Sequence, residues 1–356
     1  MSQPGFLVLE SGEIFQGIWR GGLEHAGEVV FNTSHGGYEE IATDPSYFRQ
    51  IMVMTAPMQG NYGADRQVWE SRQIWIEGFV CLELQNSARD SSWMKALAQS
   101  GVPILTDLDT RALVLRLRDQ GTPWGALVQA DNESVAKKKA QDLIRQSKDI
   151  DSDWVYLVSR KKVEDLPGKN SKGPKVAVLD FGCKENTLRE LVKRCREVRI
   201  FPSRVTPDEV KAWQPDGIML SNGPGDPQEV QKAVETVQAL LGWRFIFGIC
   251  MGHQLLALAL GAKTYKLKFG HRGGNHPIKD DLLNRIYMTS QNHGYAVDRQ
   301  SLPSGVRVTH TNLNDNTVSG IAAPDKRCFG VQFHPESHPG PHDAVNLFDY
   351  FVSQTL

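Results

Sequence analysis

The fold of the C-terminal half of this chain is decided by Phe245-Ile246-Phe247-Gly248-Ile249-Cys250-Met251-Gly252-His253-Gln254. The stretch begins as a short apolar run and passes into a leucine-rich segment, with one cysteine at the junction. Glycines stand two positions before and two positions after Cys250, which lets a strand and a helix approach closely. The pattern predicts a nucleophile elbow, a tight strand-to-helix turn that strains the nucleophile's backbone and lifts its side chain above a sheet. The helix N-terminus behind such a turn favours a thiolate.

Apolar runs alternate with amphipathic stretches through the whole of residues 174–356. This alternation predicts right-handed βαβ crossovers and a mainly parallel sheet flanked by helices. The expected strands are 176–179, 198–201, 217–220 and 245–247, and the expected helices lie around 188–192, 207–213 and 227–241. In such a sheet the chemistry sits beyond the carboxyl ends of the strands.

The preceding residues differ in character. Residues 1–130 are rich in glycine and β-branched residues, which predicts a mixed, mainly β domain. Its expected strands are 6–9, 28–31, 51–54 and 78–82, and its expected helices run from Ser91 or Ser92 to Gln99 and from Asp109 to Gly121. Residues 131–173 carry many charges of both signs and are expected to form a charged connector. We therefore expect an α/β protein with domains at 1–130 and 174–356.

The composition excludes several classes of protein. The chain has 356 residues, 40 Lys+Arg against 41 Asp+Glu, and a net charge of -1. A basic excess is usual for proteins that bind nucleic acid or anionic membranes, so neither partner is expected. We see no secretion signal and no membrane-spanning run, and we expect a cytoplasmic protein. The five cysteines include no CxxC pair, which argues against a disulfide framework or a zinc ribbon.

A thiol nucleophile needs a base, and the best candidate is His334. An apolar run, 329–333, delivers His334 at its end, and Glu336 follows two residues later. In an extended segment both side chains leave on the same side, so Glu336 can hold the imidazole and complete a Cys–His–Glu triad. His253 ranks second as the base. His334 and His338 stand four apart, but Pro335 lies between them and no third ligand is placed, so we expect no metal.

Two further polar turns lie in the same half. The loop 221–227, Ser-Asn-Gly-Pro-Gly-Asp-Pro, follows the expected strand 217–220, and its backbone N–H groups can serve as an anion hole. The second turn covers 291–295 and reads Gln-Asn-His-Gly-Tyr.

Together these segments resemble the class I (triad) glutamine amidotransferases. The resemblance rests on SNGPGDP (221–227), FGICMGHQLLALALGAK (247–263), QNHG (291–294) and FHPE (333–336). It implies that Cys250 attacks the side-chain amide of glutamine, that His334 shuttles the proton to ammonia, and that Glu336 orients His334. A γ-glutamyl thioester would form and be hydrolysed to glutamate.

Nearly the whole chain is similar to the small subunit of carbamoyl phosphate synthetases, and the similarity is weakest over 131–173. The similarity rests on GEVVFNTS (27–34), GYEE (37–40), TDPSY (43–47), TDLDTR (106–111), FGHRGGNHP (269–277) and PESHPGPHD (335–343). The resemblance implies that N–H groups of Gly223 and Met251 form the oxyanion hole. It also implies that the glutamine site is lined by Ser46, Gly223, Gly225, Gln254, Gln291, Asn292, Gly294 and Tyr295.

The resemblance further implies a partner. The chain contains no GxxxxGK[ST] motif, and no cofactor of its own is expected. A large subunit would use ATP and Mg²⁺, bicarbonate and channelled ammonia to make carbamoyl phosphate for arginine and pyrimidine synthesis. The N-terminal domain would dock it, in a heterodimer or an assembly of heterodimers. Two alternatives are an amidotransferase of another pathway, such as GMP or anthranilate synthesis, and an inactive regulatory module.

Overall fold

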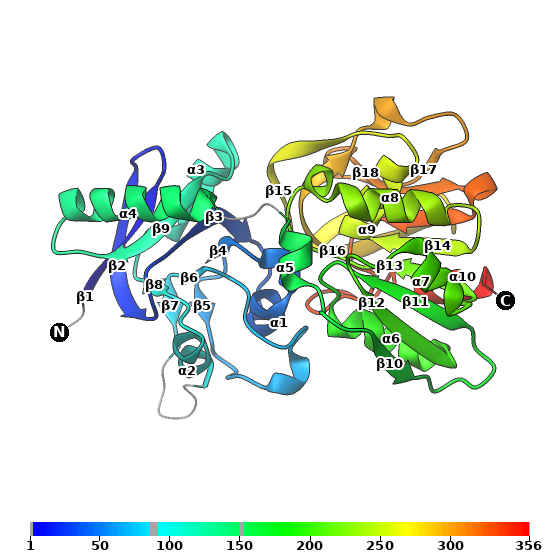
Figure 1. Ribbon diagram of the computed structural model, residues 1–356. Helices are drawn as coiled ribbons and strands as arrows, with labels where there is room; N and C mark the ends of the chain where they lie inside the picture. The colour runs from blue at the N-terminus through cyan, green and yellow to red at the C-terminus, as the bar shows by residue number, and fades with distance from the viewer. Residues whose placement is uncertain (1–2, 86–91, 150–152, 356) are drawn as a thin grey trace. The chain divides into compact units, whose positions relative to one another are not determined.

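The computed structural model describes residues 3–85, 92–149 and 153–355. The chain divides into two compact units, Met1–Asp151 and Ser152–Leu356, which we call the first and second units (Figure 1). Each unit has its own clusters of buried apolar side chains.

The first unit is built on a closed β-barrel in the order β1-β2-β8-β6-β4-β3-β9, in which β9 pairs with β1. These strands are β1 (Gln3–Leu9), β2 (Ile14–Gly21), β3 (His25–Asn32), β4 (Gln50–Met54), β6 (Gly78–Val80), β8 (Ile104–Thr106) and β9 (Trp124–Gln129). β5 (Met58–Gln59) and β7 (Glu83–Leu84) form a separate small sheet. The prediction of a mainly β domain is confirmed.

The first unit also contains the helices α1 (Tyr38–Thr43), α2 (Ser92–Gln99) and α3 (Thr110–Gln120). α3 begins where the Asp109 carboxylate accepts a hydrogen bond from the Ala112 N–H, and it ends at Gly121, whose φ is 95°. Both ends match the prediction. Ser91, the alternative start of the second helix, lies outside the described residues.

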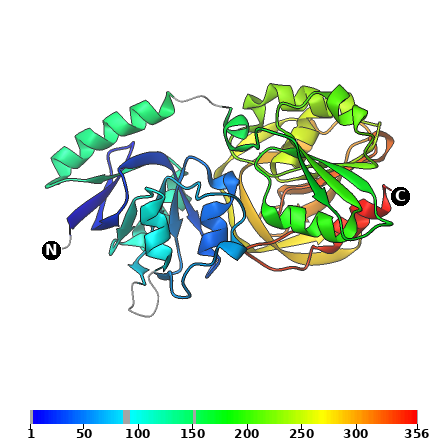
Figure 2. The ribbon, with the colours of Figure 1, turned by 60° about the horizontal axis from the view of Figure 1, so that its bottom comes forward.

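The residues expected to form a connector are divided between the two units. α4 (Glu133–Lys148) buries Ala136, Ala140 and Ile144 against barrel strands, and Figure 2 shows this helix beside them. β10 (Glu164–Pro167) instead pairs with β12 in the second unit. The three buried residues repeat every four positions, so they form one apolar stripe on an otherwise charged helix. The boundary between the two units, 151/152, thus lies within the stretch 131–173.

The second unit contains a ten-stranded sheet in the order β10-β12-β11-β13-β14-β19-β18-β16-β15-β17. Its strands besides β10 are β11 (Lys175–Asp180), β12 (Glu197–Pro202), β13 (Gly217–Leu220), β14 (Phe245–Ile249), β15 (Thr264–Asp280), β16 (Arg285–Val297), β17 (Arg307–Asn312), β18 (Val318–Ala323) and β19 (Cys328–Val331). The run from β12 to β19 is parallel, as predicted. The strands from β18 to β17 extend it in antiparallel fashion.

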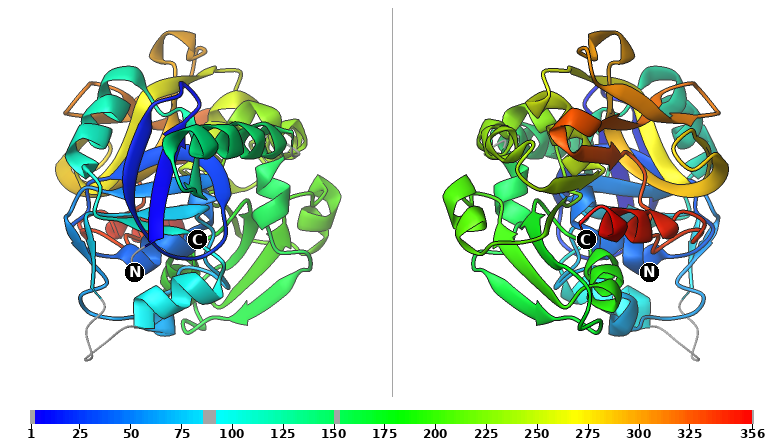
Figure 3. Two further views of the ribbon diagram at one scale, coloured as in Figure 1. Left: turned by 90° about the vertical axis from the view of Figure 1, so that its left-hand side faces the viewer. Right: turned by 90° about the vertical axis from the view of Figure 1, so that its right-hand side faces the viewer.

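Helices cover both faces of this sheet (Figure 3). One face packs against α6 (Glu185–Arg194) and α10 (Asn346–Ser353), and the other packs against α5 (Trp154–Val158), α7 (Pro207–Ala212), α8 (Gln231–Leu240) and α9 (Met251–Ala259). The α/β class is thus confirmed. Within the described ranges, no helix combines the length and the apolar character needed to cross a membrane.

Candidate active site

The predicted elbow is present at the carboxyl end of β14. Cys250 has a φ of 52° and a ψ of -105° and directly precedes α9. A Cβ added at Gly252 would lie 2.2 Å from the Leu220 carbonyl oxygen, and one added at Gly248 would lie 2.6 Å from the Gly252 carbonyl oxygen. Both glycines are therefore required by close backbone packing. A positive φ at a non-glycine residue costs about 1–3 kcal/mol, which the surrounding packing must offset.

The strand register brings Cys250 and His334 to the same edge of the sheet. Ile249 of β14 is paired with Val331 of β19 in the parallel ladder, and the Cys250 N–H donates to the Val331 carbonyl at 2.8 Å. His334 follows three residues later, where its N–H donates to the Ser290 carbonyl at 2.9 Å. Both side chains are buried. Nε2 of His334 makes no hydrogen bond within the described residues, and the Cys250 thiol contributes to raising the pKa of the imidazole.

The other ring nitrogen of the histidine is held by the carboxylate. Nδ1 of His334 lies 2.7 Å from Oε1 of Glu336, and both side chains are almost fully buried. Burial alone would lower the pKa of His334, but the Glu336 charge and the Cys250 thiol outweigh it and raise the pKa to about 10. Burial alone would raise the pKa of Glu336, but the His334 and Lys184 charges lower it to about 2. The pair therefore favours an imidazolium held by a carboxylate, which is the state that follows proton transfer from a thiol.

Sequence reasoning missed two side chains that hold Glu336. Nζ of Lys184 lies 3.5 Å from Oε1 of Glu336 and donates to the Ser337 carbonyl oxygen. Nδ2 of Asn186 donates to the Glu336 carbonyl oxygen at 2.5 Å. The buried Glu336 carboxylate needs the Lys184 ammonium, because an unpaired charge is strongly penalised there, whereas the Asn186 bond holds the Glu336 backbone. The available signal was the position of Lys184 just after β11, at the carboxyl end of a central parallel strand.

Residues 291–295, which were predicted to form a polar turn, instead lie within β16 and pair with β15. The Cys250 thiol is 3.5 Å from the Asn292 carbonyl oxygen. Nε2 of Gln254, in the first turn of α9, donates to the Tyr295 carbonyl oxygen at 2.9 Å and to Oε1 of Gln332 at 3.0 Å. The buried Gln291 side chain is hydrogen-bonded to Thr289 and His293, and Nδ1 of His293 is also 2.7 Å from the Tyr295 carbonyl oxygen.

The glycine loop also reaches the elbow. The Gly252 N–H donates to the Ser221 carbonyl oxygen at 2.9 Å, which joins the first turn of α9 to the loop. A Cβ added at Gly223 would lie 2.2 Å from the Phe181 carbonyl oxygen. Gly225 has a φ of 89° and packs on the Trp154 ring, and Met251 is buried at the start of α9. Hydrogen bonds thus join the elbow to Asn292 on β16 and to Ser221 in the glycine loop, and the roles of the other predicted residues in a glutamine site remain predictions.

Two further predicted residues have other local contacts. Ser46 belongs to the first unit, where its N–H donates to Oδ1 of Asp44 at 2.9 Å, so its place in a glutamine site remains a prediction. His253, ranked second as the base, is fully buried against Gly330 on β19, and burial lowers its pKa to about 3. Its ring is neutral and lies outside the His334–Glu336 pair.

We expect the His334–Glu336 pair to stabilise the fold most near pH 5.5 and less at both lower and higher pH. Glu336, with a lowered pKa, contributes stability above 4.5 that is lost as the pH falls toward about 2. His334, with a raised pKa, contributes stability below 6.5 that is lost as the pH rises through about 10. Urea unfolding should therefore show the largest difference between wild type and Glu336→Gln near pH 5.5, about 3–5 kcal/mol. A difference that stayed constant from pH 3 to pH 10 would contradict this assignment.

Two family models match this chain, one in each of its two units. The family model described as glutamine amidotransferase class-I matches residues 177–354. The one described as carbamoyl-phosphate synthase small chain, CPSase domain, matches residues 7–127.

Three curated relatives align over nearly the full length. The carbamoyl phosphate synthase small chain of Bacillus caldolyticus is 45% identical, covering 98% of this chain and 95% of its own. That of Symbiobacterium thermophilum is 46% identical, covering 97% of each chain. The pyrimidine-specific small chain of Bacillus subtilis is 43% identical, covering 97% of this chain and 94% of its own. The chain belongs to the carbamoyl phosphate synthase small chain family and is a glutamine amidotransferase subunit.

Proposed function

We propose that this chain hydrolyses glutamine with a Cys250–His334–Glu336 triad and delivers ammonia to a large subunit that makes carbamoyl phosphate. The observation that carries the proposal is the strained Cys250 at the end of β14, beside a buried His334 that is held by Glu336 at 2.7 Å. An inactive module of this family would have no need to retain this buried, charged arrangement, which is costly unless it is fully paired.

The chemistry follows from these positions. His334 takes the thiol proton at Nε2, and Sγ of Cys250 attacks the side-chain carbonyl carbon of glutamine. The N–H groups of Gly223 and Met251 stabilise the oxyanion, and the imidazolium returns the proton to the departing nitrogen as ammonia leaves. Water, deprotonated by His334, then hydrolyses the γ-glutamyl thioester, releasing glutamate and regenerating the thiol.

The remaining predicted residues recognise the substrate. Gln254 and Tyr295 are linked by a hydrogen bond beside the cysteine, and Asn292 lies against the thiol. Recognition of glutamine's α-amino and α-carboxylate groups is assigned to the set Ser46, Gly225, Gln254, Gln291, Asn292, Gly294 and Tyr295.

The partner supplies the second half of the reaction. The relatives' designation as a small chain implies a large subunit, which would use ATP, Mg²⁺ and bicarbonate. Because free ammonia is protonated in water, it would pass directly between the subunits of a heterodimer or of an assembly of heterodimers. The first unit provides the docking surface, the complex acts in the cytoplasm, and its product serves arginine and pyrimidine synthesis.

The test is to purify the chain with and without a carbamoyl phosphate synthase large chain. We expect glutamate release to rise when the large chain is present, in step with carbamoyl phosphate formed from glutamine. A chain that released glutamate only with a GMP or anthranilate synthase partner would belong to another pathway. No glutamate release with any partner would favour an inactive module.

A further inference from the structure

A tight turn after β11 contains Lys184, whose ammonium group contacts Glu336 of the triad. Oδ1 of Asp180, at the end of β11, accepts hydrogen bonds from the N–H groups of Gly182 at 2.9 Å and Cys183 at 2.7 Å. These bonds fold the chain so that Lys184 precedes α6 with its ammonium group beside Glu336. The Asp180 side chain is itself buried, so it needs a compensating charge.

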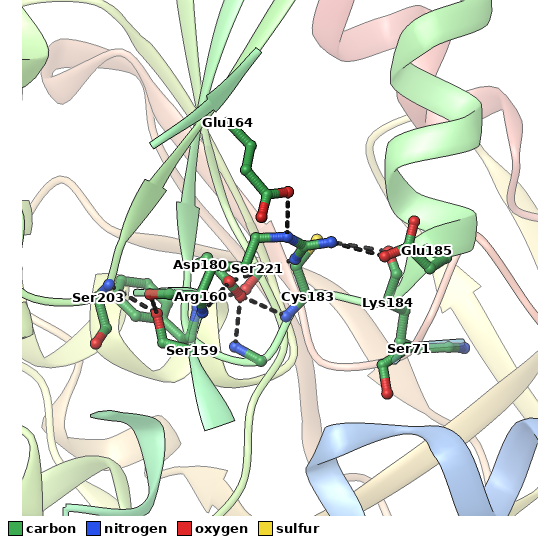
Figure 4. A network of polar contacts seen from close by, with 12 residues as sticks. Ser71, Ser159, Arg160, Glu164, Asp180, Cys183, Lys184, Glu185, Ser203 and Ser221 are labelled. Atoms are coloured by element: carbon green, nitrogen blue, oxygen red, sulfur yellow. Dashed lines mark hydrogen bonds and ion pairs between the residues drawn. The ribbon is translucent and has the colours of Figure 1, made fainter. Parts of the chain in front are cut away.

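Arg160 provides that charge and spans the turn (Figure 4). Its backbone N–H donates to Oδ2 of Asp180 at 2.8 Å, and its Nη1 lies 3.3 Å from the same oxygen. Nη2 reaches Oε1 of Glu185, in the first turn of α6, at 2.6 Å, and Nε reaches Glu164 on β10 at 2.9 Å. The Arg160 guanidinium thus contacts Asp180, just before residues 181–184, and Glu185, just after them.

The same turn is bonded to the glycine loop. The Phe181 N–H donates to Oγ of Ser221 at 2.9 Å, and the Lys184 N–H donates to Oδ1 of Asn222 at 3.2 Å. A shift of the turn would therefore move Lys184 and strain the loop that contains Gly223.

We propose that Arg160 and Asp180 are positioning residues for the triad, because they fix the turn that places Lys184 against Glu336. The inference rests on the proposed function, in which Glu336 orients His334. If the turn relaxes, the ammonium moves away from Glu336, and a buried carboxylate without that charge is harder to ionise. The ionisable side chains that interact electrostatically with Glu336 include His334, Lys184, Cys183 and His338.

The test uses the full chain carrying Arg160→Gln or Asp180→Asn. Two profiles are measured against pH: kcat and KM for glutamine hydrolysis, and the rate of Cys250 alkylation by iodoacetamide. We expect kcat to fall about tenfold with KM within twofold, the pattern of an interaction used in the transition state. The acidic limb of both profiles should move to higher pH, because Glu336 would then ionise only at higher pH. Arg160→Lys should restore part of the loss.

A double-mutant cycle tests the route through the lysine. In a Lys184→Met background, Arg160→Gln should cause no further loss of kcat, because the residue through which it acts is gone. The matched control is Arg199→Gln, which breaks a two-bond pair with Asp165 between β12 and β10 at 2.5 and 2.8 Å. That variant should keep the wild-type kcat and pH profile.

Several outcomes would overturn the proposal. One is a lower melting temperature with unchanged kcat and acidic limb, which indicates a structural role only. Another is a full, additive loss in the Lys184→Met background. If Arg160→Gln does not fold, an unchanged kcat and acidic limb in Asp180→Asn would overturn the proposal. Failure of the proposed function is recognised separately, because wild type would then release no glutamate, while the alkylation profile could still be measured.

Discussion

Cys250→Ser is expected to abolish glutamine-dependent synthesis of carbamoyl phosphate, while synthesis from added ammonia by the complex continues. A hydroxyl at this position cannot replace the thiol, because it is a far weaker nucleophile at its free pKa and the imidazole is arranged to take a thiol proton. We expect glutamate release to fall at least about 10³-fold, as is usual when a triad nucleophile is removed. The measurement compares initial rates with glutamine and with ammonium chloride in the same preparation.

The control for this variant is a second buried cysteine. Cys328 stands at the start of β19, the opposite end from His334, and burial raises the pKa of its thiol to about 12. Cys328→Ser should therefore retain glutamine use within a few-fold. If Cys250→Ser kept full use of glutamine, Cys250 would not be the nucleophile. If it lost ammonia-dependent synthesis as well, the defect would lie in assembly of the complex.

The elbow and its base could be predicted because their signals are local. Two glycines flank Cys250 at fixed spacing, and an apolar run ends at His334, so each residue's place on a strand end can be read from a few neighbours. The helix from Asp109 to Gly121 was predictable for the same reason, since an N-cap and a C-cap mark its ends.

The interactions of Lys184 and Arg160 could not be predicted in this way. Each pairs with a carboxylate far along the chain or across a turn, and an isolated charged residue most often lies in solvent. The antiparallel half of the sheet was missed as well, because β15 and β16 combine polar residues, glycines and two register shifts that hide strand alternation. The helix α4 was taken as part of a connector because only one narrow stripe of it is apolar.

His334→Asn is expected to cause the second of the two largest losses. Asparagine has no group that can accept the thiol proton, and none that can return a proton to ammonia or activate water against the thioester. Both halves of the reaction should slow, and we expect kcat for glutamate release to fall at least about 10³-fold. Because Glu336 acts only through His334, adding Glu336→Gln to this variant should cause little further loss, whereas independent roles would give additive losses.

The control for His334→Asn is His338→Asn, which also tests the alternative in which the two histidines bind a metal. His338 has a φ of 54°, a conformation that asparagine adopts readily, so this substitution should leave the backbone in place. If His334 is a base held by Glu336, His338→Asn should keep glutamate release within a few-fold of wild type. If a metal bridged the two histidines, the two variants should fail equally, because a divalent ion that loses either imidazole is no longer held in a working geometry. A much larger loss of glutamate release in His334→Asn than in His338→Asn would therefore assign the chemistry to proton transfer between a thiol and an imidazole.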